Sequence, residues 1–214
     1  MIKKIKATSS EKIILFFLIS LAIFSLTSFI IIKNKCIFVK NHNPDDFKFA
    51  APENIVVLNA PCGNVIIELY PNIAKNAVKR FKFLINAQAY NEIAFHRVIK
   101  DKLVQAGDLE YGKKNNLDYG KIGTGKSGYG EIKSELNDNF KFTKGSVGLA
   151  RTFKNDTEDS QFFILLQDEP LFQGEYTPLG KVLYGLEVLK KIKYQENSEY
   201  ILRPDFINSL SMYK

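Results

Sequence analysis

The stretch FHRVIKDKLVQAGD, from Phe95 to Asp108, says most about how this chain folds. Phe95 to Val98 and Leu103 to Gln105 have the composition of two short strands separated by a polar turn. An arginine in an apolar strand is expensive to bury unless it has a partner or a task. Gln105 lies eight residues after Arg97, an even number, so pairing of the strands could put a guanidinium and an amide in one pocket. A solvent-facing arginine on an ordinary hairpin fits the same spacing.

Short apolar strands continue on both sides of this stretch. About eight strands, mostly antiparallel, and two helices suggest a mainly β fold, a closed eight-stranded barrel, because closure removes exposed sheet edges. The segment 107–146 is rich in Gly, Asn and Lys and is expected to be mostly loop. The further strands expected are Ile55–Leu58, Val65–Leu69, Val147–Ala150, Phe162–Leu166, Leu179–Leu183 and Ile207–Met212, and the helices are Pro71–Asn86 and Leu186–Ile192.

The N-terminal segment predicts a membrane anchor. Residues 13–32 carry no charge over about 20 positions, the length that crosses a bilayer core. A basic tail, residues 1–12, precedes it and a polar stalk, residues 33–52, follows it, so the domain is expected to occupy residues 53–214. The residues after Ile32 make a poor cleavage site, which favours an uncleaved anchor over a signal peptide. The lysine balance favours a single-pass protein whose domain lies on the non-cytoplasmic side, in a periplasm or lumen.

The net charge of +7 does not indicate nucleic-acid binding. Residues 1–40 hold seven lysines and one acid, so the basic character belongs to the N-terminal segment and the rest of the chain is nearly neutral. A nucleic-acid footprint needs basic residues clustered on the domain itself. The two cysteines, Cys36 and Cys62, are too few for a disulfide framework and show no zinc spacing, so we expect both to be thiols.

The segment from Gly120 to Ser127 matches the phosphate-binding pattern G-x-x-x-x-G-K-[ST]. That pattern works between a hydrophobic strand and a helix, and here polar, glycine-rich sequence lies on both sides. We therefore reject a nucleotide site. Hydrolytic catalysis is also poorly supported, because the only histidines are His42 and His96 and no nucleophile elbow is present. His96 is expected to be a structural histidine inside the fold.

Several motifs in one order resemble the cyclophilin family of peptidyl-prolyl cis-trans isomerases. Residues 95–108 resemble its signature F-H-R-[IV]-I-x-x-F-[ML]-x-Q-x-G-D, and Ser160–Ile164 resembles its S-Q-F-F-I strand. Residues 145–152, 174–182 and 186–189 are similar to its later motifs, and the loop 123–131 is similar to its G-T-G loop. The resemblance covers about residues 53–212 and implies an eight-stranded antiparallel barrel with two helices and a proline-binding groove.

Carried over by position, the resemblance implies that Arg97 is the catalytic arginine and that Gln105 assists it. It implies that the bound peptide meets the backbone of Ala150, Arg151 and Thr152. It implies a groove formed by Lys102, Leu103, Gln161, Phe163, Leu171, Phe172 and Tyr176.

Two groove positions depart from the family pattern. Lys102 stands where the family has a phenylalanine, and Leu171 stands where many members have a tryptophan. These departures keep open a second function, a non-catalytic module of the same fold that binds proline peptides or acts as a chaperone. In either case we expect a monomeric domain whose partners are proline-containing polypeptides and a membrane reached through residues 13–32. Rotation about an X–Pro bond needs no cofactor, and no metal is expected.

Overall fold

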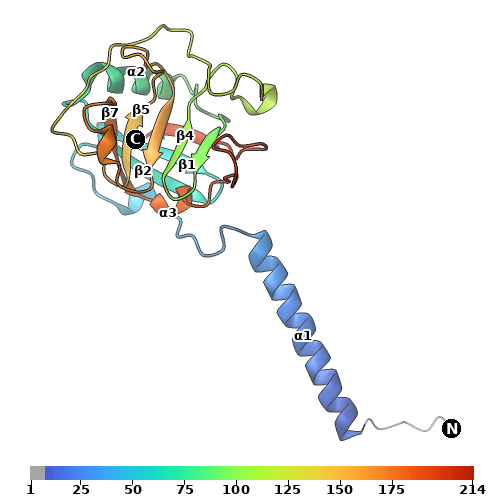
Figure 1. Ribbon diagram of the computed structural model, residues 1–214. Coiled ribbons are helices and arrows are strands. Elements are labelled where there is room, and N and C mark those ends of the chain that lie inside the picture. Colours follow the sequence, from blue (N-terminus) through green and yellow to red (C-terminus); the bar gives the residue numbers. More distant parts are fainter. Residues whose placement is uncertain (1–7) are drawn as a thin grey trace. The chain divides into compact units, whose positions relative to one another are not determined.

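The chain is mainly β and divides into two units after Phe38. The computed structural model describes residues 8–214, except for the side chains of residues 31–33. Lys3, Lys4 and Lys6 of the predicted basic tail lie outside the described residues. The first unit contains helix α1 (Ser9–Lys33), and the second unit, Val39–Lys214, contains the sheet (Figure 1).

Helix α1 begins with a capping box. The hydroxyl of Thr8 accepts a hydrogen bond from the Glu11 amide at 3.3 Å, and the Glu11 carboxylate accepts one from the Thr8 amide at 2.7 Å. Together these bonds satisfy two amide groups that a helix start leaves without partners. Within the 22 residues Ser9–Ile30, the most apolar stretch of 18 residues has a mean hydropathy of 2.6. By length and composition, this helix could span a membrane or serve as a signal sequence.

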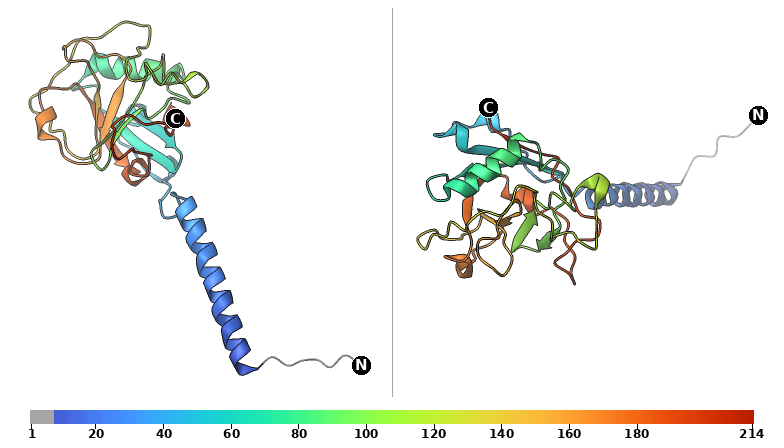
Figure 2. Two further views of the ribbon diagram at one scale, coloured as in Figure 1. Left: turned by 45° about the vertical axis from the view of Figure 1, so that its right-hand side comes forward. Right: turned by 90° about the horizontal axis from the view of Figure 1, so that it is seen from above.

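Eight antiparallel strands form one curled sheet in the order β3-β4-β6-β5-β7-β2-β1-β8 (Figures 1 and 2). Each strand is short because glycine or polar turns bound it. The central strands β5 and β6 are buried throughout, whereas the edge strands β3 and β8 are only partly buried. The eight strands are β1 (Ile55–Ala60), β2 (Gly63–Leu69), β3 (Arg97–Ile99), β4 (Leu103–Ala106), β5 (Ser146–Leu149), β6 (Phe162–Leu165), β7 (Pro178–Tyr184) and β8 (Ser209–Met212).

The expectation of a closed barrel is wrong in one respect. Within the described residues, the two edge strands β3 and β8 do not pair with each other, so the sheet is a half-barrel. The segments beside them contact through isolated bridges, Ala94 with Phe206 and Arg97 with Tyr200. The chain on both sides of this seam is irregular, so it forms single bridges where closure would need a continuous ladder.

Two α-helices belong to the second unit. Helix α2 (Lys75–Asn86) starts later than the predicted Pro71, and it buries Ala77, Val78, Phe81, Leu84 and Ile85. The ring of Phe81 packs at 5.2 Å from that of Phe162 in β6, which fixes the helix against the sheet. Helix α3 spans only Leu186–Leu189. Four 3-10 turns complete the regular structure: Pro44–Asp46, Pro52–Asn54, Lys114–Asn116 and Pro170–Phe172.

Residues 39–52, which the sequence assigned to the stalk, belong to the second unit. The Asn41 side chain accepts a hydrogen bond from the Asn64 amide at 2.9 Å, and His42 contacts Glu187 at 2.9 Å. The ring of Phe47 stacks on Tyr184 at 3.8 Å. Aromatic and amide side chains in this polar-looking segment therefore attach it to the domain.

The expectation of two cysteine thiols is also wrong. Both Cys36 and Cys62 are disulfide-bonded. Two cysteines cannot form a framework of several disulfides, but each of them can still be either a thiol or disulfide-bonded. The amino-acid count alone did not separate these cases.

Candidate active site

Arg97 and Gln105 face each other across the antiparallel pair β3–β4. The Nη1 of Arg97 donates a hydrogen bond to the Oε1 of Gln105 at 3.1 Å. The Nε2 of Gln105 in turn donates to the Oε1 of Gln161 at 3.0 Å. The even spacing noted in the sequence is therefore realised as a cross-strand pair, and the row of polar side chains continues to the residue before β6.

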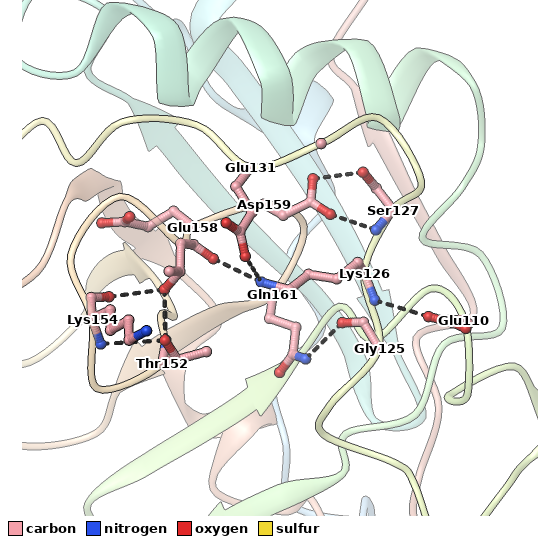
Figure 3. A network of polar contacts seen from close by, with 12 residues as sticks. Glu110, Gly125, Lys126, Ser127, Glu131, Thr152, Lys154, Glu158, Asp159 and Gln161 are labelled. Carbon is pink, nitrogen blue, oxygen red and sulfur yellow. Dashed lines mark hydrogen bonds and ion pairs between the residues drawn. The ribbon is translucent and has the colours of Figure 1, made fainter.

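A glycine loop forms one wall beside this row. The Nε2 of Gln161 donates to the Gly123 carbonyl at 3.0 Å and to the Gly125 carbonyl at 3.1 Å. Figure 3 shows the contact with Gly125. The buried carboxylate of Asp108 accepts hydrogen bonds from the amides of the same two glycines, at 2.6 and 3.0 Å. A side chain at Gly125 would collide with that carboxylate, which explains the glycine there.

The rejected phosphate-binding pattern lies in this loop. Two of its amide groups, those of Gly123 and Gly125, point at the Asp108 carboxylate. The Nζ of Lys126 binds the Glu131 carboxylate at 2.7 Å and the Thr157 carbonyl at 2.9 Å (Figure 3). Protein groups therefore occupy the donors that a phosphate would need.

An apolar cluster lies next to the polar row. Phe163 and Leu103 are almost fully buried, and Phe172 and Tyr176 pack against them. The Phe163 ring meets Phe172 at 5.4 Å and Tyr176 at 5.2 Å, both edge-to-face. Edge-to-face packing holds the rings rigidly, so the cluster presents a preformed apolar surface.

A cavity of about 460 Å³ joins the polar row and the apolar cluster. It has the size of a pocket for a small ligand or a short peptide segment. Ten predicted site residues line it: Arg97, Leu103, Gln105, Ala150, Arg151, Thr152, Gln161, Phe163, Phe172 and Tyr176. Gly123, Thr124, Gly125, Lys126, Phe153, Thr157, Asp159, Ser160 and Tyr200 complete its lining and were not predicted as site residues.

The comparisons with known proteins identify the family. Residues 55–211 match the family model of cyclophilin type peptidyl-prolyl cis-trans isomerases. A probable peptidyl-prolyl cis-trans isomerase of Brucella suis is 39% identical over 151 residues, which cover 70% of this chain and 76% of that protein. A peptidyl-prolyl cis-trans isomerase of Acinetobacter baylyi is 31% identical over 156 residues, which cover 71% and 78%.

This chain belongs to the cyclophilin-type peptidyl-prolyl cis-trans isomerases. A solved cyclophilin of Cryptosporidium parvum superposes with a TM-score of 0.65 and 25% identity over 75% of this chain and 98% of the other. One of Hirschia baltica, 22% identical, superposes with a TM-score of 0.63 over 75% of this chain and 74% of the other, which supports the fold alone.

Two predicted groove residues of this cyclophilin lie outside the cavity lining. The Nζ of Lys102 lies 3.3 Å from the Oε1 of Glu169, whose side chain is mostly buried. Leu171 is 84% exposed on the 3-10 turn that carries Phe172. The ion pair holds the Lys102 charge beside Glu169, and the neighbouring Phe172 provides the apolar surface of that turn.

The segment after β5 has its own hydrogen bonds. The Ala150 amide donates to the Gln161 carbonyl at 2.8 Å, and the Thr152 amide donates to the Thr157 hydroxyl at 3.0 Å. The Arg151 side chain donates to the Glu175 carbonyl at 2.9 Å and lies 5.1 Å from the Tyr176 ring. The backbone amide and carbonyl of Arg151 have no hydrogen bond within the described residues. The Ala150 carbonyl likewise accepts no hydrogen bond there.

His96 lies behind the polar row, next to Arg97 in the chain. It is 1% exposed, and neither ring nitrogen has a hydrogen-bond partner within the described residues. Burial lowers the pKa of the imidazole to about 4, and the negative charge of Asp108 opposes part of that effect. The ring is therefore neutral at physiological pH, which is consistent with a structural histidine.

The part of the chain that the structure describes contains no cluster of side chains that could bind a metal ion. No group of three or more His, Cys, Asp or Glu side chains is placed there to hold an ion.

Proposed function

We propose that this cyclophilin isomerises X–Pro bonds of polypeptides with Arg97 as the catalytic residue. The observation that carries the proposal is the position of its guanidinium, which lines the same cavity as the buried Phe163 cluster. A cation beside a rigid apolar surface suits a proline residue, because the ring is apolar and the carbonyl that follows accepts hydrogen bonds. The Cryptosporidium parvum relative was also crystallised in the presence of the dipeptide Ala-Pro.

To isomerise an X–Pro bond, the protein has to stabilise the twisted state of that bond more than its planar states. Rotation about an X–Pro bond breaks amide resonance against a barrier of about 18–20 kcal/mol, and it takes tens to hundreds of seconds without a catalyst. No bond to carbon is made or broken. A pocket that holds the proline ring lets the rest of the chain turn, and a donor near the proline nitrogen favours its pyramidal form. Only an interaction that is stronger in the twisted state accelerates the reaction.

The cavity can divide these tasks between its two sides. Phe163, Leu103 and Phe172 would hold the proline ring through apolar contact. Arg97 remains charged at any working pH and carries five N–H donors, so it can donate both to the proline carbonyl and toward the developing lone pair. Gln105 fixes the guanidinium through its Nη1. The backbone of Arg151 would pair with the peptide.

We also propose that α1 anchors the protein and that the isomerase domain lies on the non-cytoplasmic side. The length and hydropathy of Ser9–Ile30 support a span. The disulfide-bonded state of Cys36 and Cys62 supports the side, because disulfides persist in a periplasm or lumen and are rare in a reducing cytosol. In that place the enzyme would act on exported chains during folding.

The test is isomerisation of X–Pro peptides by the full chain in detergent. Arg97→Ala should lower kcat/KM at least tenfold, about 1.4 kcal/mol of barrier, while the fold persists. The loss should fall on turnover more than on peptide affinity, because the interaction belongs to the twisted state. Arg203→Ala is the matched control, since Arg203 is exposed and outside the cavity lining.

Two results would refute the assignment of Arg97. Equal rates for wild type and Arg97→Ala would show that another group stabilises the twisted state. A wild-type chain that binds proline peptides with no rate enhancement would show a binding module in place of an enzyme.

A further inference from the structure

The carboxylate of Glu199, which was not predicted as a site residue, contacts Arg97 from the solvent side. The Oε2 of Glu199 lies 2.7 Å from the Nε of Arg97 and 2.6 Å from its Nη2. Both contacts fall on one edge of the guanidinium, the edge formed by Nε and Nη2. The Oε1 of Gln105 accepts a hydrogen bond from Nη1 at 3.1 Å. Glu199 and Gln105 therefore hold the planar group from two directions.

The backbone fixes Glu199 in this position. The segment that carries it lies antiparallel to β3, with a bridge between Arg97 and Tyr200. The Val98 amide donates to the Glu199 carbonyl at 2.8 Å, and the Ile201 amide donates to the His96 carbonyl at 3.1 Å. These backbone hydrogen bonds, one at Glu199 and one two residues later, hold the segment against β3 and bring the Glu199 carboxylate within reach of Arg97.

We propose that Glu199 is a positioning residue for the isomerase reaction, acting through Arg97. The proposal rests on the catalytic role proposed for Arg97 above. A guanidinium carries five N–H donors in one plane. Glu199 contacts Nε and Nη2, and Gln105 accepts from Nη1, so one donor on Nη1 and one on Nη2 are left for the proline carbonyl and nitrogen. A planar group held at all three of its nitrogens cannot rotate freely, so its remaining donors are oriented before the peptide arrives.

The expected effect is modest because the pair is partly exposed. The side chain of Glu199 is 52% exposed and that of Arg97 is 30% exposed, so solvent weakens their attraction. Removing the negative charge should leave Arg97 charged and present but less well oriented. We expect a loss of about three- to fivefold in turnover, which is the range of a partly exposed ion pair. Loss of all activity is not expected, because Gln105 still contacts Nη1.

The experiment measures kcat and KM for X–Pro isomerisation by the full chain in detergent. Glu199→Gln keeps the size and the hydrogen-bonding oxygen and removes the charge. It should lower kcat about three- to fivefold and leave KM within about twofold. Glu196→Gln is the matched control, because Glu196 is exposed on the same loop and lies outside the cavity lining. It should leave both constants unchanged.

A second comparison separates positioning from a general effect on the loop. If Glu199 acts only through Arg97, then Glu199→Gln should change nothing further in an Arg97→Ala background. An equal additional loss in that background would overturn the proposal, as would a wild-type kcat in the single variant. A rise in kcat would also overturn it, because Glu199 would then compete with the peptide for Arg97. An inactive wild type would reject the proposed role of Arg97 itself, so the two failures are distinguishable.

Discussion

The buried imidazole of His96 should make the stability of this cyclophilin depend on pH in a defined window. Its pKa is about 4 in the folded chain, against an ordinary value of 6.5. As pH falls, the unfolded chain therefore binds the proton first, and folding becomes less favourable. The contribution is complete above about pH 6.5 and is lost as the pH falls toward 4. The difference between the two pKa values corresponds to about 3 kcal/mol of unfolding free energy.

The measurement is urea unfolding of wild type and His96→Leu at a series of pH values. Tyrosine fluorescence can follow it, because the chain has ten Tyr and no Trp. Leucine is apolar and does not titrate, so the variant should lose about 3 kcal/mol less than wild type between pH 6.5 and 4. Carboxylate titrations are common to both proteins and cancel in the comparison.

A direct titration checks the cause. In His42→Gln the only histidine ring signal left in the NMR spectrum belongs to His96, since the chain has two histidines. That signal should move near pH 4. Parallel stability curves for wild type and His96→Leu, or a His96 signal that moves near pH 6.5, would refute the reasoning. Either result would mean that the imidazole has access to water or to a partner that the structure does not give it.

Three further predictions concern the site and helix α1. Phe163→Ala should cost about 3 kcal/mol or more of stability and weaken peptide binding together with turnover, because it removes ring contacts made in every state; unchanged affinity in a binding titration would contradict this. ATP should not raise the melting temperature of the wild type, because Asp108 and Glu131 occupy the donors of the glycine loop; a rise that disappears in Lys126→Ala would restore the nucleotide reading. The full chain should stay with membranes through carbonate extraction, and a mature protein that begins after Ile32 would identify α1 as a signal peptide instead.

The strands could be predicted from the sequence because their information is local. Ile55, Phe162 and Leu103 each begin a short apolar run next to a turn, and the observed strands start at these residues. The seam between β3 and β8 could not be predicted, because it depends on whether segments far apart in sequence form a ladder or single bridges. Closure looked favourable since it removes edges, but the irregular chain around Ala94 and Phe206 supplies only one bridge there.

In the candidate site too, contacts within one hairpin could be predicted from the sequence, and contacts between distant segments could not. The pairing of Arg97 with Gln105 follows from an even spacing within one hairpin, so the sequence could suggest it. Glu199 lies 102 residues after Arg97 in a loop with no periodic pattern, so nothing local pointed to their contact. By its position in the motif, Lys102 was expected in the groove wall. In the structure it forms an ion pair with Glu169, which is 67 residues away in the chain. Long-range charge pairs of this kind depend on the fold and have no signature in sequence spacing.

If Arg97 is the catalytic residue proposed above, its position on an edge strand means that activity can be lost under milder conditions than the fold. β3 is three residues long, has β4 on one side, and on the other meets only the segment around Tyr200. Short, partly exposed segments open at far lower free energy than a buried sheet centre does. Mild heat or denaturant would therefore detach that segment, with Glu199, while β4, β6 and β5 remain protected. In hydrogen exchange the amides of Val98 and Ile201 would exchange early, and turnover would fall by about the three- to fivefold expected for loss of Glu199 before the chain unfolds.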